Sequence, residues 1–269
     1  MISLVNGFLD HAKEDASDSG FGEWLDELNG AMSSRSGWTV VKSEPSVDLS
    51  SFDINGKKVR NLSFEDLVSA LANQQAPSPL SYSDFAAFKA EAGKRLTKTW
   101  LTVETKTQVS IGGKSAQPLS IQLLTYFGAG TSAVPHKKGI KEGDVFIYNG
   151  HSYIGYGPLD PRNFTKSDFP SSYQLLFIDG CVSYNYYEKD YVPLKTGGTT
   201  NLDLITNGLE APAWRSGYAL GEFVGKLIDG TQPSYLDLLE SASVTDSLRV
   251  VDGELDNKYS PTRTPIRFR

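Results

Sequence analysis

The sequence predicts an α/β protein with a mostly parallel central sheet. Two short, nearly unbroken apolar runs carry this prediction, at residues 144–150 and 174–180. Runs of this length bounded by turn residues are typical of buried strands in a parallel sheet. Other stretches repeat apolar residues at helical spacing, as the crossover helices between parallel strands do. The two patterns together indicate a sheet covered by helices.

The first part of the chain alternates strand and helix. Residues 2–6 are expected to form a strand, and the apolar residues within 21–32 recur at helical spacing. Residues 38–41 are β-branched and aromatic, which favours a second strand. Ser63 is expected to cap a second helix, because its hydroxyl can accept an orphan backbone N–H and Asp66 suits the positive helix end.

A segment from about residue 76 to residue 130 interrupts this rhythm. It contains a short helix near Ser83 and two expected strands, 100–111 and 119–127, that form an antiparallel hairpin with one wet face. The segment is too short for a large core of its own. We therefore predict one domain, residues 1–269, with an inserted helix plus β-hairpin at about 76–130.

The parallel pattern returns after this segment. Residues 201–206 are a further candidate strand, helical patterns follow at 218–228 and 235–239, and 248–251 is a candidate last strand. Such alternation implies a parallel sheet with right-handed crossovers.

The overall composition argues against several classes of function. A net charge of −6 with scattered Lys and Arg does not fit a nucleic-acid surface. No apolar run approaches the roughly 20 residues that span a membrane, and residues 1–6 lack the features of a signal peptide. The single cysteine excludes an internal disulfide, and without Cys/His clustering no metal site is predicted. The natural substrate, the compartment and the oligomeric state stay open.

Two reactive side chains follow the two apolar runs. His151 comes directly after the first, and Cys181, the only cysteine, directly after the second. In open parallel sheets, ligands and chemistry collect beyond the carboxyl ends of the strands. A thiol and an imidazole delivered to that edge by successive strands make the parts of a nucleophile–base dyad. Cys181 and His151 are therefore the predicted catalytic residues.

These motifs resemble those of the caspase-like cysteine peptidases, the group that holds caspases, metacaspases, gingipains, clostripain and separase. In that group one apolar strand ends in His, and the next ends in a short polar pair and Cys. The stretch 179–183, Asp-Gly-Cys-Val-Ser, looks most like the metacaspase pattern. Ser152 departs from the family, which most often has Gly after the His. The resemblance covers nearly the whole chain apart from the insertion, and it implies a caspase-like three-layer sandwich.

The resemblance implies that the substrate is a peptide or protein. Cys181 would attack a peptide carbonyl as thiolate, and His151 would orient the attack and protonate the leaving amine. Backbone N–H groups of Cys181 and of the loop from Gly150 to Ser152 would stabilise the oxyanion. Asp179 matches the metacaspase acidic position of the first specificity pocket, which implies Arg or Lys before the cleaved bond.

Further roles follow from the same resemblance. Trp214 comes after the strand at 201–206, where caspases place a substrate-binding loop. Relatives are often held inactive until a loop is cut. Residues 189–200 have the composition of an exposed loop, so Lys189 and Lys195 are candidate autocleavage sites.

The dyad chemistry requires no cofactor. Because such peptidases are often activated by calcium, the resemblance leaves calcium binding as a possibility. Asp190 and Asp203 could join a calcium site, although their spacing resembles no dedicated loop. No other side chain is assigned to a cation.

Two other interpretations stay open. The same dyad could serve an amidase or a transpeptidase, which product analysis would separate from a hydrolase. Alternatively, the chain is a catalytically inactive caspase-like domain that binds or scaffolds. Ser152 in place of Gly, and an insertion large enough to cover the cleft, favour that alternative.

Overall fold

The computed structural model describes residues 1–269 with the exception of 11, 110–114, 244–247 and 254–269. Its main sheet contains β1 (Ile2–Asn6), β2 (Thr39–Glu44), β5 (Trp100–Val109), β6 (Gln117–Phe127), β7 (Val145–Asn149), β8 (Gln174–Asp179), β9 (Leu202–Asn207) and β10 (Arg249–Asp252). A small second sheet is formed by β3 (Phe52–Ile54) and β4 (Lys57–Val59). The helices are α1 (Ser19–Ser33), α2 (Phe64–Ala72), α3 (Phe85–Leu96), α4 (Ala133–Glu142), α5 (Tyr184–Tyr191), α6 (Ser216–Ile228) and α7 (Tyr235–Ser241).

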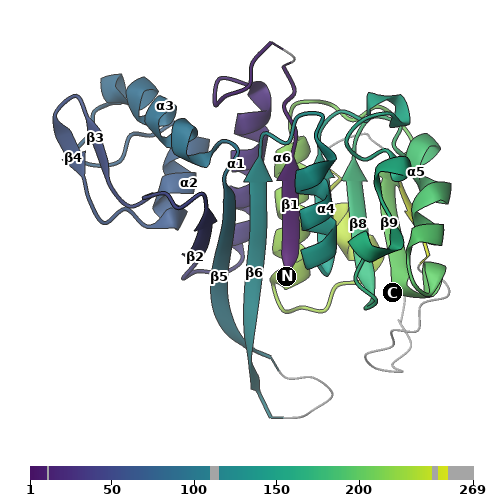
Figure 1. Cartoon of the computed structure of the whole chain (residues 1–269). Coiled ribbons are helices and arrows are strands. Elements are labelled where there is room, and N and C mark those ends of the chain that lie inside the picture. Colours follow the sequence, from purple (N-terminus) through teal and green to yellow (C-terminus); the bar gives the residue numbers. More distant parts are fainter. Residues whose placement is uncertain (11, 110–114, 244–247, 254–269) are drawn as a thin grey trace.

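The main sheet has eight strands in the order β10-β9-β8-β7-β1-β6-β5-β2 (Figure 1). The neighbours β6, β1, β7, β8 and β9 run parallel to one another. Strand β5 is antiparallel to β6, β2 is antiparallel to β5, and β10 is antiparallel to β9. The prediction of an α/β protein with a mostly parallel sheet is confirmed.

Helices cover both faces of the sheet, which gives the molecule three layers. Successive residues of a strand point to opposite faces, and β8 shows this directly. Its Leu175 and Phe177 join the core cluster that contains residues of α1, α2 and α6, whereas Leu176 and Ile178 join the cluster that contains residues of α4 and α5. Because both faces are covered, every residue of β8 is buried.

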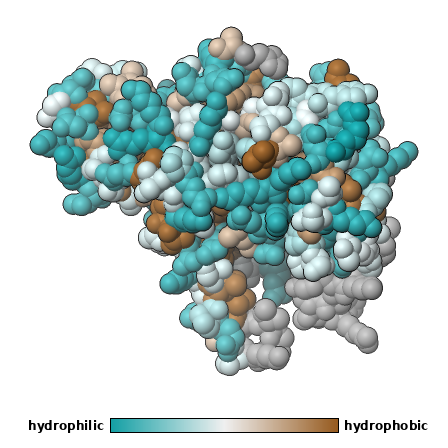
Figure 2. Space-filling model, viewed as in Figure 1, coloured by the Kyte–Doolittle hydropathy of each residue, from teal (hydrophilic) through white to brown (hydrophobic). Residues whose placement is uncertain are grey.

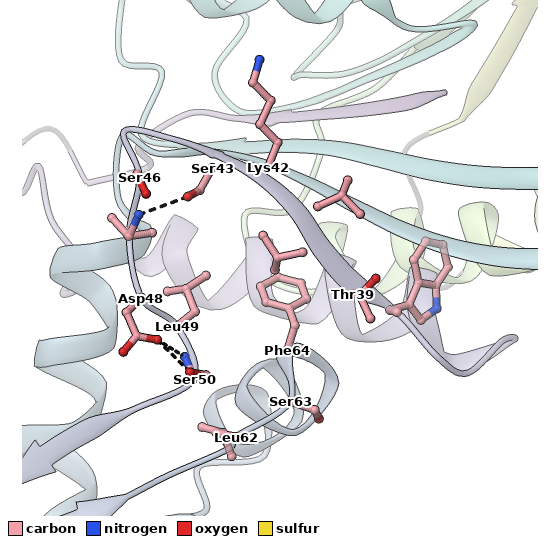
Figure 3. Close-up of a pocket in the computed structure, with 14 residues that line it drawn as sticks. Thr39, Lys42, Ser43, Ser46, Asp48, Leu49, Ser50, Leu62, Ser63 and Phe64 are labelled. Atoms are coloured by element: carbon pink, nitrogen blue, oxygen red, sulfur yellow. Dashed lines mark hydrogen bonds between the residues drawn. The ribbon is translucent and has the colours of Figure 1, made fainter.

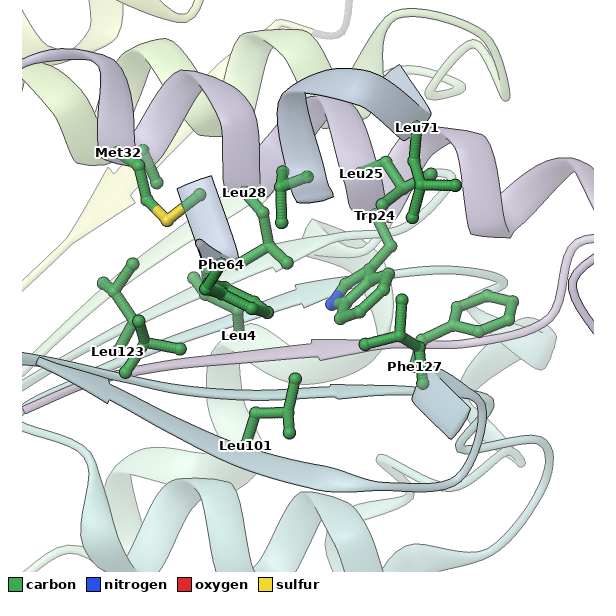
Figure 4. Packing of buried hydrophobic residues seen from close by; sticks show 14 of the residues in the cluster. Leu4, Trp24, Leu25, Leu28, Met32, Phe64, Leu71, Leu101, Leu123 and Phe127 are labelled. Carbon is green, nitrogen blue, oxygen red and sulfur yellow. The ribbon is translucent and has the colours of Figure 1, made fainter. Parts of the chain in front are cut away.

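The core under α1 shows how the sequence pattern is used. Figure 4 shows Trp24 and Leu28 of this helix directed toward the sheet, opposite residues such as Leu4 and Phe127. The indole Nε1 of Trp24 donates to the Thr125 hydroxyl at 2.6 Å, so the one polar atom of the buried ring has a partner. The helical spacing of apolar residues in 21–32 therefore predicted both the helix and its buried face.

The hairpin predicted within residues 76–130 exists, but it is part of the main sheet. Strands β5 and β6 pair antiparallel as expected. Strand β6 also pairs in parallel with β1, from Leu123 opposite Ile2 to Phe127 opposite Asn6. The expectation of an inserted hairpin is thus corrected. The physical reason is that Leu123 and Leu124 are consecutive and both buried, which requires a strand covered on both faces.

Other local predictions are confirmed. The Ser63 hydroxyl accepts the backbone N–H of Asp66 at 3.0 Å and caps α2. Strands β1, β7, β8, β9 and β10 lie within a residue or two of their expected positions, as do α6 and α7.

The surface on the face of Figure 2 is mostly hydrophilic, with small and separate hydrophobic patches. Within the part of the chain that the structure describes, no helix is long and apolar enough to cross a membrane.

Candidate active site

The two predicted catalytic residues follow neighbouring parallel strands. Strands β7 and β8 pair with Asn149 opposite Asp179, and two residues further on the chain reaches His151 and Cys181. The backbone N–H of Gly150 donates to the carbonyl of Asp179 at 3.4 Å. The pairing therefore brings the segments that carry the imidazole and the thiol side by side, at the carboxyl ends of the strands.

Contacts with Leu9, Tyr148 and Tyr153 help to fix the position of His151. Its Nε2 atom lies 2.9 Å from the carbonyl oxygen of Leu9, its own carbonyl accepts the Tyr148 hydroxyl at 2.8 Å, and its ring meets that of Tyr153 edge-on at 5.7 Å. A carbonyl oxygen only accepts, so Nε2 carries a proton. Burial raises the pKa of Tyr148 well above its usual range, which keeps its hydroxyl protonated and able to donate.

A buried carboxylate holds the Leu9 carbonyl in place. Asp18 accepts the backbone N–H groups of Leu9 at 3.0 Å, of Asp10 at 2.7 Å and of Gly20 at 2.7 Å. The same side chain therefore caps α1 and clamps the loop that contacts the imidazole.

Cys181 lies on a tight turn after β8. Its side chain is partly exposed, and Sγ donates to the carbonyl of Ala211 at 3.6 Å. The next residue, Val182, has φ of 51°, and its N–H donates to the Leu209 carbonyl at 2.9 Å. A β-branched residue in the left-handed region costs on the order of 1–3 kcal/mol and is typical of functional sites. The turn thus stores strain next to the only cysteine.

The loop after His151 can aim backbone N–H groups toward Cys181. A Cβ on Gly180 would lie 3.3 Å from the Gly150 oxygen and from the Ser152 nitrogen, so the two turns are in contact. Ser152 has φ −75° and ψ −17°, an ordinary region for any residue. Its carbonyl accepts the Tyr187 hydroxyl at 2.7 Å. Ser152 therefore holds this conformation without backbone strain.

Asp179 is fully buried and already bound to side chains of this protein. Its Oδ1 atom accepts Nδ2 of Asn207 and Nη1 of Arg249, each at 2.5 Å. Arg249 is partly exposed as a residue, but its side chain is only 8% exposed and forms an ion pair with Asp179. Among the described residues, the second oxygen of Asp179, Oδ2, has no hydrogen-bond partner.

Asp179 belongs to a row of buried polar residues that the motif did not reveal. Strands β1, β7, β8 and β9 end in Asn6, Asn149, Asp179 and Asn207. Each of these polar residues terminates an apolar run, and that was the signal available in the sequence.

Below this row, α1 contributes a buried acid. Glu27 Oε2 accepts Nδ2 of Asn6 at 2.6 Å. Burial raises the pKa of Glu27 to about 8, and the neighbouring carboxylates of Asp179 and Glu23 raise it further in the same direction. Buried polar groups therefore lie beneath the strand ends, and Glu27 holds its proton at neutral pH.

The predicted substrate-binding residue Trp214 lies on the loop between β9 and α6 and is 66% exposed. The loop is tied to α1, because Glu23 accepts the N–H groups of Arg215 at 2.9 Å and Gly217 at 2.6 Å. The Arg215 guanidinium lies 5.8 Å from the Trp214 ring. An exposed indole on an anchored loop is a suitable apolar contact for a bound chain.

The candidate autocleavage residues differ in environment. Lys189 is exposed on α5. Lys195 is 3% exposed, its Nζ donates to Gln174 Oε1 at 3.2 Å, and burial lowers its pKa to about 8. The expectation of an exposed loop over 189–200 is thus corrected, because this segment folds as the end of α5 and two 3-10 turns packed on the sheet.

The two carboxylates weighed for calcium lie in different settings. Asp190 is exposed on α5, whereas Asp203 is buried on β9 and accepts the hydroxyls of Tyr173 and Tyr235. Among the described residues, no group of three or more His, Cys, Asp or Glu is arranged to hold a metal ion.

An open groove lies at the far edge of the sheet from Cys181. Figure 3 shows it between β2 and the start of α2, lined by Thr39 and Ser43 of the strand and by Ser63 and the apolar Phe64 at the start of the helix. It includes none of the predicted site residues.

Comparisons with known proteins give no assignment: no family model, no curated protein and no solved structure matches this chain.

Proposed function

We propose that this protein is a caspase-like cysteine endopeptidase that hydrolyses peptide bonds through Cys181 and His151. The observation that carries the proposal is the parallel pairing of β7 and β8, with Asn149 opposite Asp179. Two residues after these strand ends, the chain reaches His151 and Cys181. The three-layer arrangement and the contact between the two turns support it. Fold alone does not fix a reaction, so the site residues carry the argument.

The reaction would proceed through an acyl-enzyme. The Cys181 thiolate adds to the peptide carbonyl carbon, and the resulting oxyanion accepts N–H groups of Cys181 and of the Gly150–Ser152 loop. The C–N bond then breaks, and the proton held by His151 passes to the leaving amine. Water next attacks the thioester, His151 takes its proton, and the thiolate is released with the carboxylic acid.

The thiol's hydrogen bond to Ala211 is compatible with this scheme. In unliganded enzymes, catalytic hydrogen bonds are often long or absent and tighten only when the substrate binds. The thiol is partly exposed, so a substrate can reach it from solvent.

The proposed specificity is for Arg or Lys before the cleaved bond. Asp179 is buried at the end of β8, two residues before the thiol, and its Oδ2 atom has no hydrogen-bond partner among the described residues. A carboxylate is the group that binds a cationic side chain through charge-assisted hydrogen bonds.

Turnover of a fluorogenic peptide panel, with product masses, tests the proposal. We expect hydrolysis products, and loss of more than 100-fold in rate in Cys181→Ala and in His151→Ala with unchanged melting temperatures. Ligated products would instead identify a transpeptidase. Turnover that survives both substitutions would contradict the proposal.

A second candidate is a caspase-like domain that binds peptides without cleaving them. The observation that favours it is the Arg249 guanidinium bound to Asp179, the carboxylate expected to receive the substrate. In that case Cys181 of the folded protein would not react with iodoacetamide, whereas an activated thiolate alkylates readily.

A further inference from the structure

Arg249 is placed where the basic side chain of a substrate is expected. It lies at the start of β10, opposite Asn207 at the end of β9. Its Nη1 atom donates to Asp179 Oδ1 at 2.5 Å and also to Asn207 Oδ1. Its guanidinium carbon lies 5.0 Å from the centre of the Phe177 ring.

These contacts are the ones that would recognise an arginine of a bound peptide. A carboxylate neutralises the charge, an amide oxygen accepts a second hydrogen bond, and an aromatic face packs on the guanidinium plane. The pair is monodentate, and Asp179 Oδ2 is buried without a partner among the described residues. Arg249 therefore uses only one of the two carboxylate oxygens, whereas a bidentate arginine would use both.

The element that supplies Arg249 is a short strand at the edge of the sheet. Among the described residues β10 pairs with β9 alone, and its four residues are partly exposed. Strands β8 and β9, which supply Asp179 and Asn207, are buried along their whole lengths. Arg249 therefore comes from a less buried strand than the two that supply its partners.

We propose that Arg249 occupies the binding position on Asp179 and Asn207 that a basic side chain of the substrate would take, so that it determines how readily the site accepts such a side chain. The proposal rests on the proposed function. A substrate Arg or Lys must displace this guanidinium from Asp179, and the wild-type protein therefore reacts slowly with short basic substrates. Removal of Arg249 increases reactivity toward basic residues alone.

The test is the rate at which Cys181 is labelled by peptidyl-Arg and peptidyl-Leu acyloxymethyl ketones, followed by intact mass. We expect Arg249→Gln to raise the rate with the Arg probe at least tenfold and to leave the Leu probe and iodoacetamide within twofold of wild type. The double variant Asp179→Asn with Arg249→Gln is the matched control. It should show no increase in the labelling rate with the Arg probe, because it lacks the carboxylate.

Arg249→Lys is measured in parallel, because Arg249→Gln leaves a buried carboxylate that can destabilise the fold. A single ammonium group holds Asp179 and Asn207 less well than a guanidinium, so a smaller rise is expected. An unchanged or lower rate with the Arg probe in the folded variants, while iodoacetamide still reacts, would overturn this inference alone. Iodoacetamide reactivity that does not depend on His151 would overturn the proposed function and this inference with it.

Discussion

The Nε2 atom of His151 lies 2.9 Å from the carbonyl oxygen of Leu9, a residue that precedes it by 142 positions. Since the carbonyl can only accept, this contact assigns a proton to Nε2, and in the neutral ring Nδ1 carries the lone pair. A base needs both a defined tautomer and a defined orientation. The first loop of the chain therefore helps to orient the ring of His151, which lies two residues beyond the end of β7.

Loss of the clamp on this loop should slow the thiol chemistry. Asp18→Ala removes three hydrogen bonds to backbone N–H groups, including that of Leu9. We expect alkylation of Cys181 by iodoacetamide to slow by about tenfold, because the imidazole loses its fixed orientation. Ser63→Ala, which removes the cap of α2, is the control. It should reduce stability by about 1 kcal/mol and leave the alkylation rate unchanged. Equal rates in the two variants would argue against a positioning role for Asp18.

The Tyr148 hydroxyl should matter to reactivity as well as to stability. Tyr148→Phe leaves the His151 carbonyl without its 2.8 Å donor. Tyr191→Phe removes a hydrogen bond to the Leu159 carbonyl from a tyrosine that is buried to the same extent. Each substitution should lower the free energy of unfolding by about 1–2 kcal/mol. Only Tyr148→Phe is expected to slow Cys181 alkylation. Denaturant unfolding and alkylation rates measured on both variants check this pair of outcomes.

Glu27 should make the fold less stable as the pH rises. Its pKa is about 8 in the folded protein and 4.5 in the reference state, so between these values the folded chain holds a proton that the unfolded chain has released. Stability then falls with rising pH, by up to about 1.4 kcal/mol per pH unit, and the fall ends above about pH 8. Glu27→Gln should flatten this dependence and keep an oxygen for Asn6. Glu240→Gln, at an exposed position, should leave the pH dependence of stability unchanged. Urea unfolding of both variants and the wild type from pH 5 to 9 checks this difference.

Trp214 should contribute to peptide binding and not to the reactivity of the thiol. Its indole is 66% exposed on a loop that Glu23 anchors. Trp214→Ala should slow labelling by peptidyl ketones by about tenfold, because an exposed aromatic that becomes buried on binding is a strong contact. Iodoacetamide, which has no peptide chain, should react at the wild-type rate. Tyr82→Ala, at a site 87% exposed on another element, serves as the control. If Trp214→Ala slowed the reaction with iodoacetamide to the same extent, Trp214 would have a structural role instead of a role in peptide binding.

The sequence was most informative where apolar periodicity decides the structure. Strands β7 and β8 are buried on both faces, so their runs were visible and their terminal polar residues could be placed at one edge of the sheet. Helix α4 was not predicted because its buried side includes Pro135, His136 and Gly139, which give no apolar stripe. The position of β6 beside β1 was also out of reach, since pairing between distant segments leaves no local signal.

The partners of Asp179 could not be predicted for a related reason. Arg249 is separated from it by 70 positions and reaches it only because β10 returns antiparallel along β9. For the segment around Lys195 the local composition was misleading. Its glycines and threonines are typical of an exposed loop, yet the tertiary contact with Gln174 buries the lysine.

The most direct test of the account is covalent labelling of the folded chain by peptidyl-Arg and peptidyl-Leu acyloxymethyl ketones, read by intact mass and peptide mapping. The account predicts one adduct, on Cys181, and no adduct in His151→Ala at the same concentration and time. No adduct from either probe, with or without calcium in a chain shown to be folded, would contradict a catalytic dyad. Labelling of His151→Ala at the wild-type rate would contradict it equally.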